Sequence, residues 1–193
     1  MTYAANNGDH LGQRLVFEEC LPLSCKVVDA LPFGSEYLAL QISNEEALHA
    51  IMMVEEVPKD NPDDSSADAQ DILRLEYKIN VMFELLVGLY QREVKLPAAV
   101  NVTLRSDAIQ WYGTQPLDVG SLVMVNVYMS RKYPKPLVLP GTVSAVGEQS
   151  EPSLTVTFGE AVSGRIRDWI DKFIFRHHRR AVAHARSLSN NAS

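Results

Sequence analysis

The sequence predicts an α+β fold in which long helices precede a small antiparallel β-barrel or sandwich. Two observations carry this prediction. Apolar residues recur at helical spacing through residues 43–96, and the spacing changes to strict alternation after Pro97. Short strands then follow one another with no helix between them until an amphipathic helix ends the pattern. Helices followed by strands, without βαβ alternation, are typical of an α+β protein.

Residues 1–42 are expected to form an extended N-terminal segment that packs on the β domain. Short apolar runs in this segment alternate with Pro22, Pro32 and Gly34. Proline and glycine at such intervals interrupt helices and favour short strands joined by turns. This segment is therefore predicted to contain strands rather than a helix.

Residues 43–96 are expected to form a helical insertion that makes the protein oligomeric. Ser43 has the position of an N-cap, and Glu46 three residues later completes a capping box. The pattern predicts one helix over about 43–56 and a second over about 66–95, separated by the acidic loop PKDNPDDSSAD.

The second helix carries the most regular pattern in the chain. Its apolar residues alternate steps of three and four for about two and a half heptads, at Ile72, Leu75, Ile79, Met82, Leu86 and Leu89. The flanks of this seam are apolar at Phe83, Leu85 and Tyr90, so the helix must be covered from more than one side. Burial inside its own domain is one interpretation. We expect instead a bundle of more than two chains, a homotetramer, because a strict heptad exceeds what packing within one chain requires.

The β region is expected to hold about five strands, each rich in Val, Leu, Thr or aromatic residues. Turn sequences such as GTQPLDVGS and RKYPKP separate them. The predicted strands are Val100–Leu104, Ala108–Tyr112, Leu122–Met129, Leu137–Val146 and Leu154–Phe158. So many short strands in about sixty residues favour a small antiparallel barrel or sandwich.

A final helix is predicted from Ser163, which has the position of its N-cap. The helix carries a wide apolar stripe made of Ile166, Trp169, Ile170, Phe173 and Ile174, and His177 continues the same face. The stripe is expected to close the β domain. Residues 188–193 are expected to form a disordered tail.

Several classes of function are excluded by composition. The net charge of −6 argues against a general nucleic-acid binder. No phosphate loop, nucleophile elbow or metal motif occurs, so we expect no enzyme, no catalytic residues, no metal and no cofactor. Cys20 and Cys25 have neither a second pair nor a nearby histidine, so reduced thiols are expected. A cytoplasmic protein without a transmembrane segment is expected, since neither a signal sequence nor an uncharged apolar span is visible.

The element order of residues 97–187 resembles the PilZ domain, a small β-barrel closed by a helix. The resemblance lies in the segments LRSDAIQWYG, PLDVGS, LVMVNVYM, LVLPGTVSAV, LTVTFGE and RIRDWIDKFIFRHHRR. The acidic loop and the heptad helix further resemble the atypical, tetrameric branch of that family. The resemblance implies a barrel and a role in bacterial cyclic di-GMP signalling.

PilZ proteins bind cyclic di-GMP through two motifs, R-x-x-x-R before the first barrel strand and [D/N]-x-S-x-x-G on the early strands. The second motif aligns with Thr103, Arg105 and Ala108, which replace its acid or amide, its serine and its glycine. Before the barrel, only Arg92 is present. Two phosphates need several fixed guanidinium groups, so the departures imply weak or absent binding in the usual mode.

Another R-x-x-x-R, formed by Arg176 and Arg180, lies in a basic run that also contains Arg179. The run follows the barrel instead of preceding it. One interpretation is that the cations complement the negative end of the last helix. The alternatives are a surface for an anionic partner and a ligand site assembled between subunits.

Together these features predict a non-catalytic adaptor in cyclic di-GMP signalling or type IV pilus-linked motility, oligomerised by the heptad helix. Its expected partners are further copies of itself and a protein of the signalling or pilus machinery. One alternative is an oligomerisation or protein-interaction module without a nucleotide role. Others are a cyclic di-GMP receptor that uses non-standard residues and a protein whose basic tail lies on anionic lipid.

Overall fold

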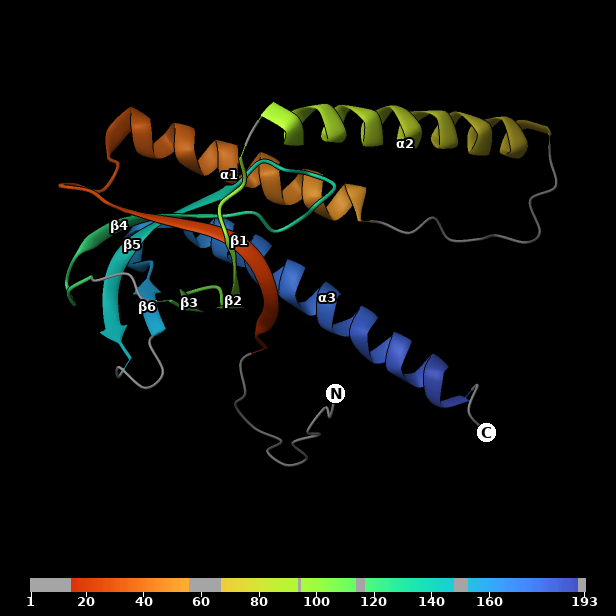
Figure 1. Cartoon of the computed structure of the whole chain (residues 1–193). Helices are drawn as coiled ribbons and strands as arrows, with labels where there is room; N and C mark the ends of the chain where they lie inside the picture. Colours follow the sequence, from red (N-terminus) through yellow and green to blue (C-terminus); the bar gives the residue numbers. More distant parts are fainter. Residues whose placement is uncertain (1–14, 56–66, 94, 114–116, 148–152, 191–193) are drawn as a thin grey trace.

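Six antiparallel strands close into a barrel, which confirms the predicted α+β class and decides between barrel and sandwich (Figure 1). The computed structural model describes residues 15–55, 67–93, 95–113, 117–147 and 153–190. Around the barrel the strand order is β1-β2-β3-β6-β5-β4. The strands are β1 (Phe17–Val27), β2 (Ala99–Leu104), β3 (Ala108–Tyr112), β4 (Leu122–Val127), β5 (Leu137–Val146) and β6 (Ser153–Thr157).

Strand β1 is a full member of the barrel and does not merely pack on it. Its first half pairs with β2, with Phe17 opposite Leu104, and its second half pairs with β4, with Leu23 opposite Val127. Without β1 the facing edges of β2 and β4 would be unpaired. The β domain therefore extends beyond the predicted range 97–187 and needs a strand from the N-terminal segment.

The barrel interior and two helices form one apolar core. Alternate residues of the strands point inward, as at Val123, Val125 and Val127 of β4, which are fully buried. Helix α1 (Gly34–Val54) contributes Leu48 and Ile51 to the same core. After the short helix η1 (Gly159–Ala161), helix α3 (Gly164–Asn190) lays its stripe on the barrel; the buried members of the stripe are Ile166, Ile170, Phe173 and Ile174.

Helix α1 begins at Gly34, nine residues before the expected N-cap at Ser43. Phe33 is extended, and Gly34 has φ 58°, a conformation that glycine adopts without strain, so the chain turns directly into the helix there. No glycine or proline follows until the helix has ended, so nothing stops it in between. The expected boundary was wrong because Ser43 lies inside the helix, where it cannot act as an N-cap.

Two buried amides hold α1 to the barrel and to the start of α3. Asn44 donates from Nδ2 to the carbonyl oxygen of Val138 at 2.7 Å, and its Oδ1 accepts from the Val138 N–H at 2.9 Å. Strand β5 pairs with β6 only from Thr142 onward, so Asn44 takes the place of a strand partner at Val138. Gln41 similarly donates to the Ala161 carbonyl oxygen and accepts from Ser163 N–H.

The predicted start of α3 is confirmed, and its predicted end is wrong. Ser163 Oγ accepts from the Ile166 N–H at 3.4 Å, as an N-cap does. The helix then continues to Asn190, so residues 188–190 belong to it and not to a disordered tail. Residues 181–186, AVAHAR, include three alanines and favour this continuation. Residues 191–193 lie outside the described part of the chain.

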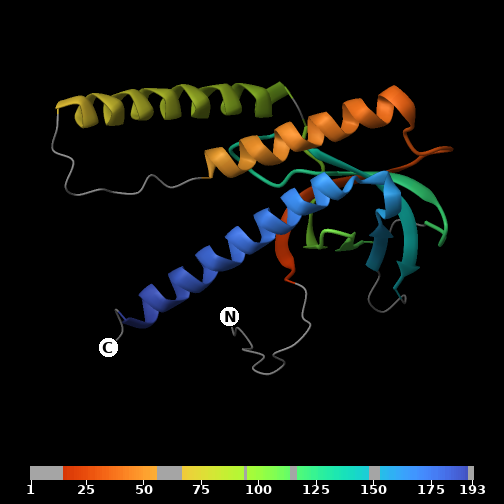
Figure 2. The same ribbon diagram turned by 180° about the vertical axis from the view of Figure 1, so that it is seen from behind.

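Helix α2 spans Ala67–Glu93, in agreement with the predicted range of about 66–95. It stands apart from the barrel (Figure 1). It runs above α1 in the opposite direction and is displaced along it, as Figures 1 and 2 both show. The N-terminal half of α2 extends past the C-terminal end of α1, and the N-terminal half of α1 extends past the end of α2. Residues 58–66 of the acidic loop expected between them lie outside the described residues, and its last two residues, Ala67 and Asp68, belong to α2.

Candidate functional site

The heptad seam of α2 is uncovered. Its six residues, Ile72, Leu75, Ile79, Met82, Leu86 and Leu89, have exposed fractions between 54 and 63%. Burial of this seam within its own domain is therefore excluded for the described chain. A row of six large apolar side chains in water is unfavourable, and patches of this kind mark contacts with other molecules.

Of the four residues aligned with the usual ligand motifs, three lie together: Thr103 lies two residues before Arg105, and the Arg105 N–H donates to the carbonyl oxygen of Ala108 at 2.8 Å. Ala108 is buried in the ladder between β3 and β6, where it faces Thr157. Thr103 is half-buried on β2. Arg105 is half-exposed, and its Nε lies 3.2 Å from Oδ1 of Asp107, so a neighbouring carboxylate already offsets its charge.

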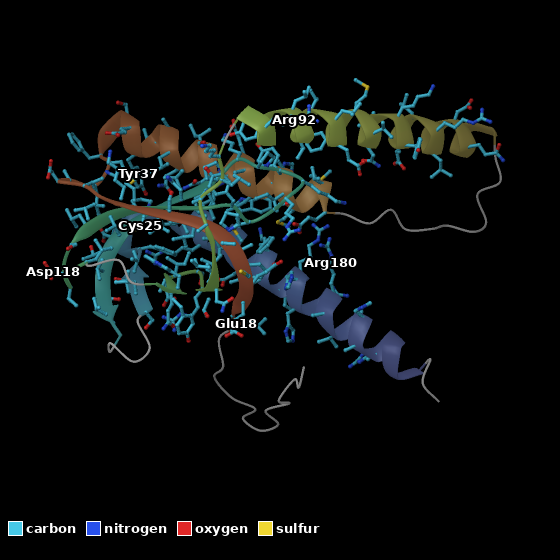
Figure 3. The ribbon with its side chains drawn as sticks, viewed as in Figure 1. Glu18, Cys25, Tyr37, Arg92, Asp118 and Arg180 are labelled. Atoms are coloured by element: carbon cyan, nitrogen blue, oxygen red, sulfur yellow. The ribbon has the colours of Figure 1, made fainter. Side chains whose placement is uncertain are left out.

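Arg92 lies away from these residues, in the last turn of α2 (Figure 3). It comes just before β2, whereas Arg105 comes just after it. The six residues of β2 span roughly 17 Å at about 3.3 Å per residue. Arg92 and Arg105 therefore lie beyond opposite ends of one extended strand, which is a poor arrangement for clamping a single dinucleotide.

A groove of about 1010 Å³ lies instead at the beginning of β2. Its walls come from β1, from the segment before β2, from the connection after β4 and from α3. Its lining includes the acidic residues Glu19 and Glu55, the basic residues Lys95, Arg131 and Arg180, and the histidines His177 and His184. Leu21, Met129 and Phe173 supply apolar surface. The groove thus combines apolar walls with cations from three separate segments.

Arg180 anchors α3 to the end of α1 at this groove. Its Nη2 donates to the carbonyl oxygen of Glu55 at 2.7 Å, and its Nη1 lies 3.5 Å from Oε2 of the same residue (Figure 3 labels Arg180). Glu55 is the C-cap of α1, and the last turn of α1 contains no basic residue of its own. Arg180 therefore supplies the cation that the negative end of α1 lacks.

The basic run does not complement the end of its own helix. Arg180 lies ten residues before α3 ends at Asn190, because the helix is longer than expected. The residues of the run also point in different directions. His177 packs against Phe17 with ring centroids 4.7 Å apart, whereas Arg179 is exposed beside Phe175. The interpretation that the cations complement the end of α3 was therefore wrong, since Arg180 binds at the end of α1 instead.

We expect Arg180→Gln to lower the free energy of unfolding by about 1 kcal/mol, because it removes a charge-assisted hydrogen bond at a helix end. Arg179→Gln is the matched control and should change it by no more than about 0.3 kcal/mol. Urea denaturation of the two variants makes this comparison. Equal effects of the two substitutions would contradict the anchoring role of Arg180.

The two cysteines lie on β1 as free thiols in different surroundings. Cys20 is exposed at the groove, whereas Cys25 is half-buried and burial raises its pKa from 9.0 to about 11. Burial also raises the pKa of Tyr128, which lines the groove, and the nearby Tyr90 of α2 raises that pKa further. The C-terminal end of α2 thus lies beside the groove.

Iodoacetamide at pH 8 should modify Cys20 and spare Cys25, because the thiolate is the reactive form. The folded protein holds the proton of Cys25 more tightly than the unfolded chain does. This contribution to stability is therefore present below pH 9 and is lost as the pH rises toward 11. Peptide mass spectrometry after timed labelling measures the reactivity of each thiol. Equal labelling of Cys20 and Cys25 would contradict the predicted difference in reactivity.

Comparisons with known proteins agree with this architecture. A family model described as "Atypical PilZ domain, cyclic di-GMP receptor" matches residues 48–187, well over half of the chain. The chain belongs to the atypical PilZ family. A solved structure from Xanthomonas campestris, titled as a new tetrameric PilZ domain self-assembled via an unusual helical bundle, is also similar. Its TM-score is 0.66 at 20% identity, over 89% of this chain and 92% of that one. No curated protein matches.

Membership of the atypical PilZ family confirms the resemblance drawn from residues 97–187 and extends it back into α1. Among the groove's lining residues, Arg180 was identified from the sequence, whereas Glu55, Lys95 and Tyr128 were missed because they lie far apart in sequence and no spacing rule connects them. The buried amides had a visible signal: Gln41 and Asn44 fall at helical spacing before the apolar Leu48 and Ile51. Among the described residues of this PilZ protein, no helix has the length and apolarity to cross a bilayer.

Proposed function

We propose that this PilZ protein is a non-catalytic adaptor of cyclic di-GMP signalling or type IV pilus-linked motility in the bacterial cytoplasm, assembled as a homotetramer through α2. The observation that carries the proposal is the exposed heptad seam on a helix that the described chain does not cover. The helical bundle named for the Xanthomonas campestris PilZ protein supports the same use of the added helix.

The energetics favour assembly through this helix. Burial of one Leu or Ile side chain contributes about 2 kcal/mol, so six seam residues offer about 12 kcal/mol per chain before the costs of association. In a two-chain coil, the flank at Leu85, which is 65% exposed in the single chain, would stay in water. A bundle of four chains covers the seam and one flank, which is why we favour a tetramer.

The proposed adaptor binds cyclic di-GMP weakly or not at all in the usual mode. Ala108 is buried, Arg105 is paired with Asp107, and Arg92 lies beyond the other end of β2. The dinucleotide's two phosphates would meet no fixed pair of guanidinium groups there. Its signal would then reach the adaptor through a protein partner of the signalling or pilus machinery.

Two measurements on the full chain test this function. Sedimentation equilibrium at micromolar concentration should give the mass of four chains. Titration calorimetry should give no dissociation constant at or below about 1 μM for cyclic di-GMP. A monomeric wild type would contradict the proposed assembly. Tight binding of cyclic di-GMP would contradict the proposal that the adaptor binds it weakly or not at all, but it would not contradict the assembly.

The groove supports a second candidate, a cyclic di-GMP receptor that uses non-standard residues. Lys95, Arg131 and Arg180 bring cations to apolar walls in a space of about 1010 Å³. If titration detects binding, Lys95→Ala should weaken it at least tenfold, and Arg105→Ala on the usual motif should not. The reverse result would assign binding to the usual motif, and no binding by any variant would reject this candidate.

A further inference from the structure

The first half of β1 has a strand partner on only one of its two edges. Residues Phe17–Pro22 pair with β2, whereas β4 pairs only with Leu23–Val27. Among the described residues, no strand lies beside the other edge of Phe17–Pro22, which is the red end of β1 in Figure 1. Backbone N–H and C=O groups along such an edge can pair with another chain. We call this edge the open edge of β1.

Hydrogen bonds at the end of this half identify the backbone groups that point to the open edge. The Leu23 N–H donates to the carbonyl oxygen of Ala98 at 3.3 Å, so the odd-numbered residues of β1 point their backbone groups toward β2. The Tyr128 N–H donates to the carbonyl oxygen of Pro22 at 3.0 Å, so the even-numbered residues point the other way. The N–H and C=O groups of Glu18 and Cys20 therefore face the open edge.

The chain after β4 turns away before it can cover the open edge. The register in which Leu23 faces Val127 would place Cys20 opposite Ser130 if the ladder continued. The ladder ends at Val127, and Ser130 Oγ instead accepts from the N–H of Lys132 at 3.3 Å. Both Cys20 and Ser130 are described, and no backbone hydrogen bond joins them. The place beside Cys20 that a longer β4 would fill is therefore left to another chain.

The groove of about 1010 Å³ lies at this missing pairing. Its lining includes Cys20 from β1 and Ser130 from the connection after β4, and Met129 and Phe173 supply apolar walls. Glu19 also lines the groove. It falls on the inward-facing side of β1 but is exposed, so the core does not cover that side here. The groove thus offers hydrogen-bonding groups and apolar surface to a chain that lies along the open edge.

Two features of the lining indicate what kind of chain fits the groove. Glu55 is already bound by Arg180, so these two charges offset each other. The remaining Lys, Arg and Glu residues of the lining are Lys95, Arg131 and Glu19, which leaves an excess of positive charge. An acidic side chain is therefore favoured beside the open edge. The N–H and C=O groups of β1 itself are best matched by an extended peptide backbone.

We propose that the open edge of β1 binds an extended, acidic segment of a protein partner by strand addition. The backbone of the segment pairs with Glu18 and Cys20, and alternate side chains of the segment face Met129 and Phe173. The β1 strand of a second copy is a poor occupant, because Glu18 and Glu19 of two copies would lie side by side. This inference rests on the adaptor role proposed above, since it supplies the site at which the protein partner binds.

Amide hydrogen exchange of the full chain, measured at single residues, tests the open edge directly. In the protein alone, the protection factor of the Cys20 N–H should be at least tenfold lower than those of Glu19 and Leu21, whose N–H groups point toward β2. Equal protection of the three amides would show that the edge is already covered and would overturn the proposal.

A synthetic peptide in which Val and Thr alternate between terminal Asp residues is the probe for strand addition. At millimolar concentration it should raise the protection factor of Cys20 at least tenfold. The same peptide with methylated backbone nitrogens should have no effect, because it cannot donate to β1. Replacing its Asp residues by Lys should weaken binding at least tenfold at low salt. Absence of protection by the probe, equal protection by the methylated peptide, or protection by cyclic di-GMP alone would overturn the proposal.

A substitution at Cys20 supplies an independent measurement. Cys20→Pro removes the N–H that faces the open edge and none that points toward β2, and Pro22 already occupies the next position of this kind. The variant should keep the circular dichroism of the folded barrel and bind the probe at least tenfold more weakly. Cys20→Ala, which keeps the N–H, is the matched control and should bind as the wild type does.

Equal binding of the probe by folded Cys20→Pro and Cys20→Ala proteins would overturn the proposal. If Cys20→Pro does not fold, the methylated peptide still makes the comparison on the unaltered chain. The outcome is separate from that of the proposed assembly, because β1 and the groove belong to a single chain. A monomeric wild type would contradict the assembly and leave the open edge of β1 as the site of strand addition.

Discussion

Replacing Ile79 and Leu86 by Asp is expected to convert the assembled protein into monomers. Both side chains belong to the exposed seam of α2. The two substitutions remove about 4 kcal/mol of apolar burial per chain, and each would place an unpaired carboxylate in the bundle core. About 1.4 kcal/mol corresponds to a tenfold change in an equilibrium constant, so dissociation should be complete at micromolar concentration.

A matched control lies on the same helix. Asn80→Asp with Glu84→Asp alters exposed polar positions away from the seam and should leave the mass unchanged. Sedimentation equilibrium gives the mass of each variant, and circular dichroism shows whether the barrel remains folded. An assembled Ile79→Asp, Leu86→Asp protein would show that α2 does not hold the copies together.

Replacing Asn44 by Leu should cause the largest loss of stability of any single change considered. Leu has the same number of side-chain heavy atoms as Asn but no hydrogen-bonding group, so the Val138 N–H and carbonyl oxygen each lose their partner. Asn44 is 1% exposed, so water cannot replace it. A buried polar group without a partner costs about 1–3 kcal/mol, so two cost on the order of 2–6 kcal/mol.

Ser43→Ala is the neighbouring control and also tests where α1 begins. An N-cap serine replaced by Ala costs about 1 kcal/mol, whereas at an interior helical position Ala is the better helix former. Urea denaturation should therefore show a large loss for Asn44→Leu and none for Ser43→Ala. A small loss for Asn44→Leu would mean that β5 obtains its hydrogen bonds elsewhere.

Local periodicity was enough to predict the strands, the heptad helix and the start of α3. Each of these elements shows its pattern within a few residues, as in the alternation around Val102 or the N-cap at Ser163. The prediction of where α1 starts was wrong because it used the same local evidence. Ser43 satisfies the local capping rule, but the helix continues through it. Tertiary contacts of Gln41 and Asn44 support the earlier turns.

The sequence by itself determined the α+β class, the family and the apolar heptad seam of α2, which we propose other copies of the chain cover. Only the tertiary structure showed that β1 closes the barrel between β2 and β4, and that Arg180 reaches the end of α1. Both contacts join segments about a hundred or more residues apart, since Leu23 pairs with Val127 and Glu55 with Arg180. Periodicity indicates which face of a helix or strand a residue lies on, whereas its contacts with distant segments depend on the tertiary structure of the whole chain.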